Sequence, residues 1–156
     1  MVRFDSEEAA RANSERPEQD QFWSETSKQF DGDATFQESN EVYVDVRGDL
    51  DSAGFVQIMV GASSNRERTV ELMTGTRDAR AELRPEILGQ VAVAHGGGKF
   101  TLANYYTSEA EARVGEAKPI PQDLAERFAE IMSLGVGVPE YLDLRTPWLD
   151  SPASTP

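Results

Sequence analysis

Two strand-like runs joined by three glycines constrain the fold of this chain most strongly. The first run, ILGQVAVAH, covers residues 87–95, and the second, KFTLANYYT, covers residues 99–107. Both are rich in the β-branched, aromatic and other apolar residues that favour strands. The glycines between them, Gly96–Gly98, adopt positive φ without steric cost and allow a tight reversal. The pattern predicts a β-hairpin, whose short connection requires antiparallel pairing.

Further elements precede the hairpin. The segment GFVQIMVG at residues 54–61 predicts a strand bounded by glycines. Ser64 with Glu67 three residues later forms a capping box, which predicts the start of a helix. Gly75 interrupts or ends this helix, and Pro85 marks its last possible turn.

A second helical region follows the hairpin. Ser108 and Glu111 form another capping box, and prolines at 119 and 121 break and restart the helix. Residues 139–149, PEYLDLRTPWL, then predict a final strand. The order β-α-β-β-α-β predicts an α+β fold: a ferredoxin-like antiparallel sheet with both helices on one face. An apolar stripe supports the last helix, formed by Leu124, Phe128, Ile131 and Met132.

The N-terminal part of the chain repeats the part that follows the hairpin. At one constant offset the two segments share identical residues, and Phe22, Thr26 and Phe30 fall on Leu124, Phe128 and Met132 of the helical stripe. We therefore predict that residues 1–50 are the second half of a ferredoxin-like domain, that residues 54–150 are a complete copy, and that residues 151–156 are a disordered tail. The identical pairs are Ser6 and Ser108, Glu7 and Glu109, Ala10 and Ala112, Arg11 and Arg113, and Pro17 and Pro119.

Composition excludes several classes of partner. A net charge of -13 repels phosphate, so neither nucleic acid nor an anionic membrane is expected to bind. The sequence has no cysteine and one histidine, which excludes disulfides, thiolate metal sites and a multi-histidine centre within one chain. Carboxylates alone remain as ligands for Mg²⁺ or Ca²⁺, and no metal site is predicted. No apolar run resembles a membrane span or a secretory signal, so a cytoplasmic location is expected.

The segment YYTSEAEAR, residues 105–113, joins an aromatic strand to a helix through Ser-Glu. With the order of elements, it makes residues 54–150 resemble the antibiotic-biosynthesis-monooxygenase-like (ABM) family of the dimeric α/β-barrel superfamily. The resemblance implies that two ferredoxin-like sheets pack face to face, from two chains or from two tandem domains. A tandem ancestor explains the repeat.

The candidate pocket residues come from the alternation of strand side chains. Phe55, Gln57 and Met59 share one face of the first strand, and its opposite face is purely apolar. If that apolar face meets the helices, Gln57 points into the barrel. Together with Asn104, or with Tyr105 on the opposite face of its strand, Gln57 then orients a flat aromatic ligand. The alternative is that these polar groups are satisfied within a packed or wet interface.

The resemblance implies a second set of expectations. The family's oxygenase members use an asparagine, a tryptophan and a histidine around the pocket. Here Gln57 stands where the asparagine is expected, and the hairpin contains no tryptophan. His95 borders the glycine turn, where we expect solvent exposure, and is a weak candidate site residue. Haem degradation is disfavoured, and no cofactor is expected.

Two functional hypotheses follow. The first, which we favour because no obvious base is present, is a small-molecule-binding or stress-associated barrel protein of ABM type. The second is a cofactor-independent monooxygenase acting on an aromatic substrate. A contiguous pocket between the sheets that holds at least two of the three polar groups would favour the enzyme, and a filled interior would favour the binding protein.

The predicted sheet also bears on assembly. Phe55, Met59, Phe100 and Leu102 lie on the face assigned to the barrel interior, which the helices of the same domain do not cover. Such a face is larger than a monomer usually exposes. We therefore expect a homodimer with the sheets face to face about a twofold axis.

Overall fold

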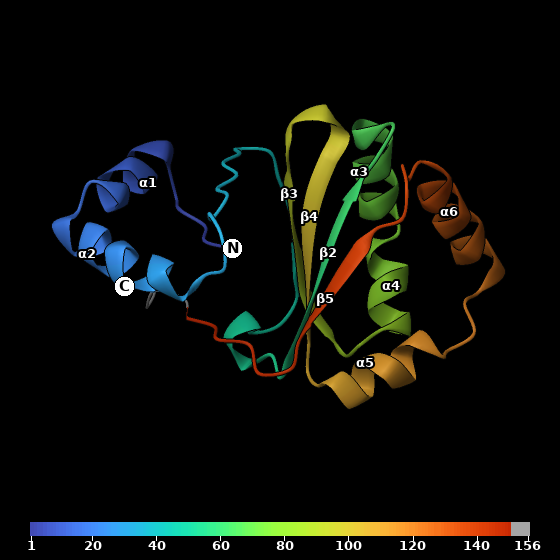
Figure 1. Ribbon diagram of the computed structural model, residues 1–156. Helices are drawn as coiled ribbons and strands as arrows, with labels where there is room; N and C mark the ends of the chain where they lie inside the picture. Colours follow the sequence, from blue (N-terminus) through green and yellow to red (C-terminus); the bar gives the residue numbers. More distant parts are fainter. Residues whose placement is uncertain (151–156) are drawn as a thin grey trace. The chain divides into compact units, whose positions relative to one another are not determined.

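A five-stranded antiparallel sheet organises the larger part of the molecule (Figure 1). The strands lie side by side in the order β1-β3-β4-β2-β5, and each neighbouring pair is antiparallel. The four strands that follow β1 have the order expected for β-α-β-β-α-β connectivity, so the predicted α+β, ferredoxin-like fold is confirmed. The strands are β1 (Val42–Val46), β2 (Phe55–Ala62), β3 (Ile87–Ala94), β4 (Lys99–Tyr106) and β5 (Glu140–Leu144).

The computed structural model describes residues 1–150, so the tail predicted for 151–156 lies outside the described residues. The chain divides into two compact units, the first ending at Gln37 and the second beginning at Glu38. The division lies upstream of the 50/54 boundary expected from the repeat, because β1 pairs along its whole length with β3. This pairing adds a fifth strand to the four expected and covers a β3 edge that would otherwise be open.

The N-terminal unit is helical. It contains α1 (Glu7–Ser14), α2 (Pro17–Thr26) and a short 3-10 turn, η1 (Ser27–Gln29). Ser6 caps α1 by accepting from Ala9 N at 3.1 Å, as its counterpart Ser108 caps a helix of the same length in the second unit. The two copies thus agree at this helix, while the partial repeat as a whole remains a prediction.

The α-helices of the second unit lie on one side of the sheet (Figure 1). The helix expected after β2 is interrupted at Gly75, one of the two outcomes foreseen, and the prolines at 119 and 121 separate the second pair. The helices are α3 (Arg66–Gly75), α4 (Arg77–Leu83), α5 (Glu109–Glu116) and α6 (Gln122–Ser133), and a 3-10 turn, η2 (Leu50–Ser52), precedes β2.

The two capping boxes have different outcomes. Ser108 accepts from Glu111 N at 3.2 Å, as predicted. Ser64 does not cap α3, because its backbone N–H and its hydroxyl both donate to Leu134 O, at 2.8 and 3.0 Å. Ser64 is therefore bonded to the loop that contains Leu134. The next residue, Asn65, caps the helix instead, because its side chain accepts from Arg68 N.

The β3–β4 hairpin is confirmed, and its turn explains the glycines. The turn, η3 (Gly96–Gly98), has φ of 72° at Gly97 and 77° at Gly98, a conformation that disfavours other residues. At Gly98 a side chain would also collide with the carbonyl oxygen of Ser63, whereas Gly97 has open space. Gly98 is therefore needed on two grounds.

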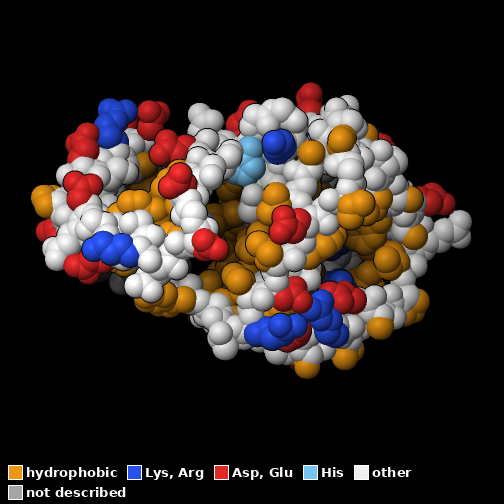
Figure 2. All heavy atoms as spheres, viewed as in Figure 1, with side chains coloured by type: hydrophobic (Ala, Val, Ile, Leu, Met, Phe, Trp, Pro, Cys, Tyr) orange, Lys and Arg blue, Asp and Glu red, His pale blue; other side chains and the backbone are white. Residues whose placement is uncertain are grey.

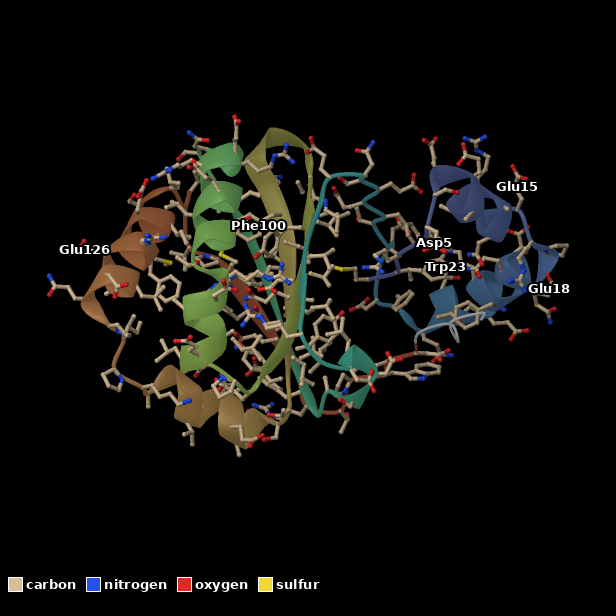
Figure 3. The ribbon with its side chains drawn as sticks, turned by 180° about the vertical axis from the view of Figure 1, so that it is seen from behind. Asp5, Glu15, Glu18, Trp23, Phe100 and Glu126 are labelled. Carbon is tan, nitrogen blue, oxygen red and sulfur yellow. The ribbon has the colours of Figure 1, made fainter. Side chains whose placement is uncertain are left out.

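The face of the sheet that meets the helices is the opposite of the one expected. Phe55 packs with Ala112 of α5, and Met59 and Leu102 lie with side chains of α3 and α6. Phe100, on the same face of β4, lies between the sheet and α3 (Figure 3). The expectation that the purely apolar face meets the helices, and that these four residues form a dimer surface, is therefore wrong.

The face that the helices of the second unit leave uncovered, called the uncovered face below, is instead the one that contains Val56, Ile58 and Val60. The cross-strand register places the valines of β1 and the leucines of β5 on the same side. The final segment of the chain covers part of this face, since Leu149 packs against Val56 and Ala103. Several of its apolar side chains are 38–47% exposed, namely Val42, Val44, Val46, Val60, Leu142 and Leu144.

Candidate functional site

A cavity of about 320 Å³ lies between the sheet and its helices. Its floor is formed by β2, β3 and β4, and its walls by α3, α4, α5 and α6. The lining combines apolar side chains with several polar and charged ones, and such polar groups fix the orientation of a ligand in small-molecule sites. The principal lining residues are Gln57, Met59, Gln90, Leu102, Asn104 and Tyr106 from the sheet, and Met73, Arg80, Glu116, Lys118 and Phe128 from the helices and their connections.

Three polar side chains of the cavity form a chain of hydrogen bonds with a fixed direction. Arg80 donates from Nη1 to Gln90 Oε1, and Gln90 donates from Nε2 to Asn104 Oδ1 at 2.6 Å. Because a guanidinium only donates, it fixes the orientation of the Gln90 amide, which in turn fixes that of Asn104. The amino group of Asn104 is therefore the donor at the end of this chain.

The Gln57 amide has the opposite orientation to that of Asn104, because its amino group and not its oxygen is hydrogen-bonded. Gln57 occupies the position paired with Asn104 across β2 and β4, and its Nε2 donates to Asp143 Oδ1 at 2.9 Å. The other oxygen of Asp143 accepts from Arg113 Nη2 at 2.5 Å. The hydrogen bond from Gln57, followed by that from Arg113, lowers the pKa of Asp143, which stays an acceptor. The carbonyl oxygen of Gln57 is thus left as an acceptor on a residue that lines the cavity and is paired with Asn104.

A buried carboxylate lies at the Arg80 end of this series of hydrogen bonds. Asp45, on the helix-facing side of β1, is 1% exposed and lies against Arg47, Arg77 and Arg80. Arg80 is itself 6% exposed and also donates to Tyr43 Oη at 3.1 Å. These contacts attach α4 to the edge of the sheet next to the cavity.

Tyr106 closes one side of the floor. Its ring packs on Phe55 with centroids 5.6 Å apart. Burial raises the pKa of the Tyr106 phenol, more than the nearby Arg84 charge lowers it. The phenol is therefore protonated at neutral pH and can donate a hydrogen bond, but it is not a base.

The predicted site residues separate into three groups. Gln57, Met59 and Asn104 line the cavity together. Phe55 is fully buried behind it, against Tyr106 and Ala112. Tyr105 lies on the opposite face of the sheet, where it packs against the cluster of Ala53, Val56 and Ala103.

His95 lies at the hairpin turn and does not line the cavity. Its Nε2 is 2.9 Å from Thr101 Oγ1, so the side chain is held against β4. The residue is half-buried, not solvent-exposed as expected, although part of it reaches the surface in Figure 2, where histidine is pale blue.

Two important residues of the site were not predicted. Gln90 had a signal, because it is the one polar side chain in the run ILGQVAVA. Arg80 had none, because it lies in a charged helical segment, RDARAEL, that is typical of an exposed helix. Within residues 1–150, no three histidine or carboxylate side chains gather as a group able to hold a metal ion.

Searches against known proteins give a likeness in structure only. No protein-family model matches the sequence, and no curated protein does. A candidate monooxygenase from Lactobacillus acidophilus superposes with a TM-score of 0.64 at 11% identity, over 90% of this chain and 65% of that one. This chain therefore spans less than two thirds of that protein's length.

Two further structures have lower scores. A monooxygenase from Streptomyces coelicolor, solved with nanaomycin D, has a TM-score of 0.49 at 20% identity, over 65% of this chain and 95% of that one. A ferredoxin-fold protein from Listeria monocytogenes, related to antibiotic biosynthesis monooxygenases, has a TM-score of 0.45 at 16% identity, over 76% and 71%. None of the helices within residues 1–150 is long and apolar enough to cross a membrane. At these low identities the likeness concerns the fold alone, which is the ferredoxin-like arrangement of the second unit.

Proposed function

We propose that this chain is a small-molecule-binding protein of ABM type that holds a planar aromatic ligand in the cavity between its sheet and its helices. The observation that carries the proposal is the position of Gln57 and Asn104, which lie side by side on the floor of one contiguous cavity. At about 320 Å³ the cavity falls near the lower end of the range of ligand sites, roughly 300–1,000 Å³. A flat ring system of two fused rings is a suitable occupant.

The polar floor supports a particular pattern of ligand groups. Asn104 offers an N–H donor and Gln57 offers a carbonyl acceptor, each oriented by a charged residue behind it. The surrounding side chains of Met59, Leu102 and Phe128 contact the faces and edges of a ring. A ligand with an acceptor oxygen and a neighbouring hydroxyl or N–H satisfies both floor groups without leaving a buried polar atom unpaired.

A cofactor-independent monooxygenase is the second candidate. It is favoured by the presence of two of the three predicted polar residues in one cavity, although this cavity lies between sheet and helices and not between two sheets. The residues give it less support than binding. Tyr106 is protonated, and the Glu116 carboxylate is paired with Arg113 at 3.0 Å, so neither is a free base for deprotonating a substrate.

Calorimetric titration with 2-naphthamide tests the binding proposal. Met59→Phe fills the cavity and should abolish binding, whereas Ile58→Phe, the next residue on the opposite face of β2, should leave binding unchanged. Equal affinity of both variants, or no binding by the unmodified chain of either 2-naphthamide or its acid, 2-naphthoate, would contradict the proposal. Oxygen uptake in the presence of an electron-rich dihydroxynaphthalene, measured against a protein-free control for autoxidation, tests the second candidate.

A homodimer, with a cytoplasmic location, is part of the proposal. The apolar face that contains Val44, Val60 and Leu142 is not covered by the helices of its own unit, and these side chains are 40%, 38% and 47% exposed. A second copy that packs the same face about a twofold axis would cover them. Nucleic acid and membrane remain unexpected partners because of the net charge of -13.

A further inference from the structure

Asp45 is neutralised mainly by two of the three arginines that surround it. Arg47 donates to both of its oxygens, at 3.2 and 2.6 Å, and Arg77 Nε lies 2.7 Å from Oδ1. Arg80 is the most distant, with Nη2 at 3.5 Å from Oδ2. One carboxylate is therefore the counter-ion of three guanidinium groups. The positive charge of Arg80 is the one that this carboxylate neutralises least, because it is the most distant.

The other contacts of Arg80 are with neutral groups. They are the Gln90 amide oxygen, the Tyr43 hydroxyl and the carbonyl oxygen of Met73. The Arg80 Nε has no hydrogen-bond partner within residues 1–150. Arginine stays protonated even when buried, so the site retains a positive charge. Burying a charge without a full counter-charge has a large desolvation free energy, so the burial of Arg80 calls for a physical reason.

The remaining charged side chains that line the cavity have partners of opposite sign. Arg84 and Lys118 both pair with Glu86, and Glu116 pairs with Arg113. Each of these wall charges therefore has a partner of opposite sign, although Arg84 and Lys118 share one, and positive charge is also in excess where α4 meets β3. An anionic group bound next to Arg80 would supply the missing counter-charge.

We propose that the cavity selects aromatic carboxylates, with the carboxylate at the Arg80 end and the ring between Met59, Leu102 and Phe128. This inference rests on the proposed binding function and adds the charge of the ligand to it. The Asn104 amino group, directed by Arg80 through Gln90, supplies a further donor to the polar part of the ligand. Arg80 is then a specificity-determining residue on an element that is not part of the sheet floor.

Two probes of the same shape test the proposal. Calorimetric titration at low salt compares 2-naphthoate with neutral 2-naphthamide, using the unmodified chain. We expect naphthoate to bind roughly tenfold or more tightly, the value of one charge-assisted hydrogen bond. Equal affinities would overturn this inference and leave the binding function standing, whereas no binding of either probe would overturn both. This comparison needs no variant, so it does not depend on whether a substitution at a buried arginine folds.

Three variants assign the preference to its residue. Arg80→Gln should remove the preference for naphthoate while naphthamide still binds, and Arg80→Lys should retain part of it. Arg84→Gln is the matched control, because Arg84 also lines the cavity but is paired with Glu86. Circular dichroism checks that each variant is folded. A preference that survives Arg80→Gln, or that is lost in Arg84→Gln alone, would contradict the role of Arg80.

Discussion

Gln57 and Asp143 occupy paired positions on β2 and β5, and the Gln57 amide donates to the Asp143 carboxylate at 2.9 Å. Arg113 of α5 holds the same carboxylate from the other side. The orientation of a cavity group is therefore set by the last strand and by a helix that follow the hairpin. This contact connects the stability of β5 with the polarity of the cavity floor.

Replacing Asp143 with asparagine should destabilise the protein at about pH 7 by about 1 kcal/mol, because it removes the charge that binds Arg113 and Gln57. The folded pKa of Asp143 is lowered from 3.8, so its contribution is fully present above that value and is lost as the pH falls through the folded pKa. The difference between the two proteins should therefore shrink at about pH 3. Urea unfolding at both pH values measures it, and a difference that does not change with pH would contradict the assignment.

The hairpin turn gives a second prediction. Gly97→Ala should destabilise by about 1 kcal/mol, the cost of a left-handed conformation for a residue with a side chain. Gly98→Ala should cost more, because the new methyl group also meets the Ser63 carbonyl oxygen. Thermal unfolding of the two variants provides a matched comparison, since both positions have nearly the same φ. Equal losses would show that the turn relaxes around the new side chain.

The start of α3 gives a third prediction. Asn65→Ala should cost about 1 kcal/mol, the usual value for a lost N-cap. Ser64→Ala should cost less, because its exposed hydroxyl bonds one loop carbonyl and does not cap the helix. Chemical denaturation distinguishes the two. A larger loss at Ser64 would restore the capping box that the sequence suggests.

The same position shows what sequence patterns resolve and what they do not. Local signals located the hairpin, the glycine turn and the Ser108 cap, because turn chemistry and capping depend on neighbouring residues. The Ser64 box failed because a distant residue, Leu134, takes both donors of Ser64. The pairing of β1 with β3 depends likewise on residues far apart in the chain.

The site was half predictable for a related reason. Alternation along β2 correctly separated Gln57 from Ile58, but it does not say which face the helices cover. An apolar face was the natural choice for burial, yet Gln57, Gln90 and Asn104 satisfy their polar groups through one another and through charged side chains, so the polar face is buried instead. Arg80 could not be found, because its burial results from the packing of α4 on a sheet edge completed by β1.

The choice of face leads to the last prediction, which concerns assembly. Val44 on the uncovered face and Val70 on α3 are each 40% exposed, so a glutamate at either position has a similar cost for folding of one chain. If two copies pack through the uncovered face, Val44→Glu places an unpaired charge in the interface and should give monomers, while Val70→Glu should stay dimeric. Light scattering at micromolar concentration measures the mass, and burial of roughly 800 Å² per partner is enough for a specific contact. An unmodified chain that is monomeric, or a Val44→Glu variant that remains dimeric, would show that this face is not where two copies meet.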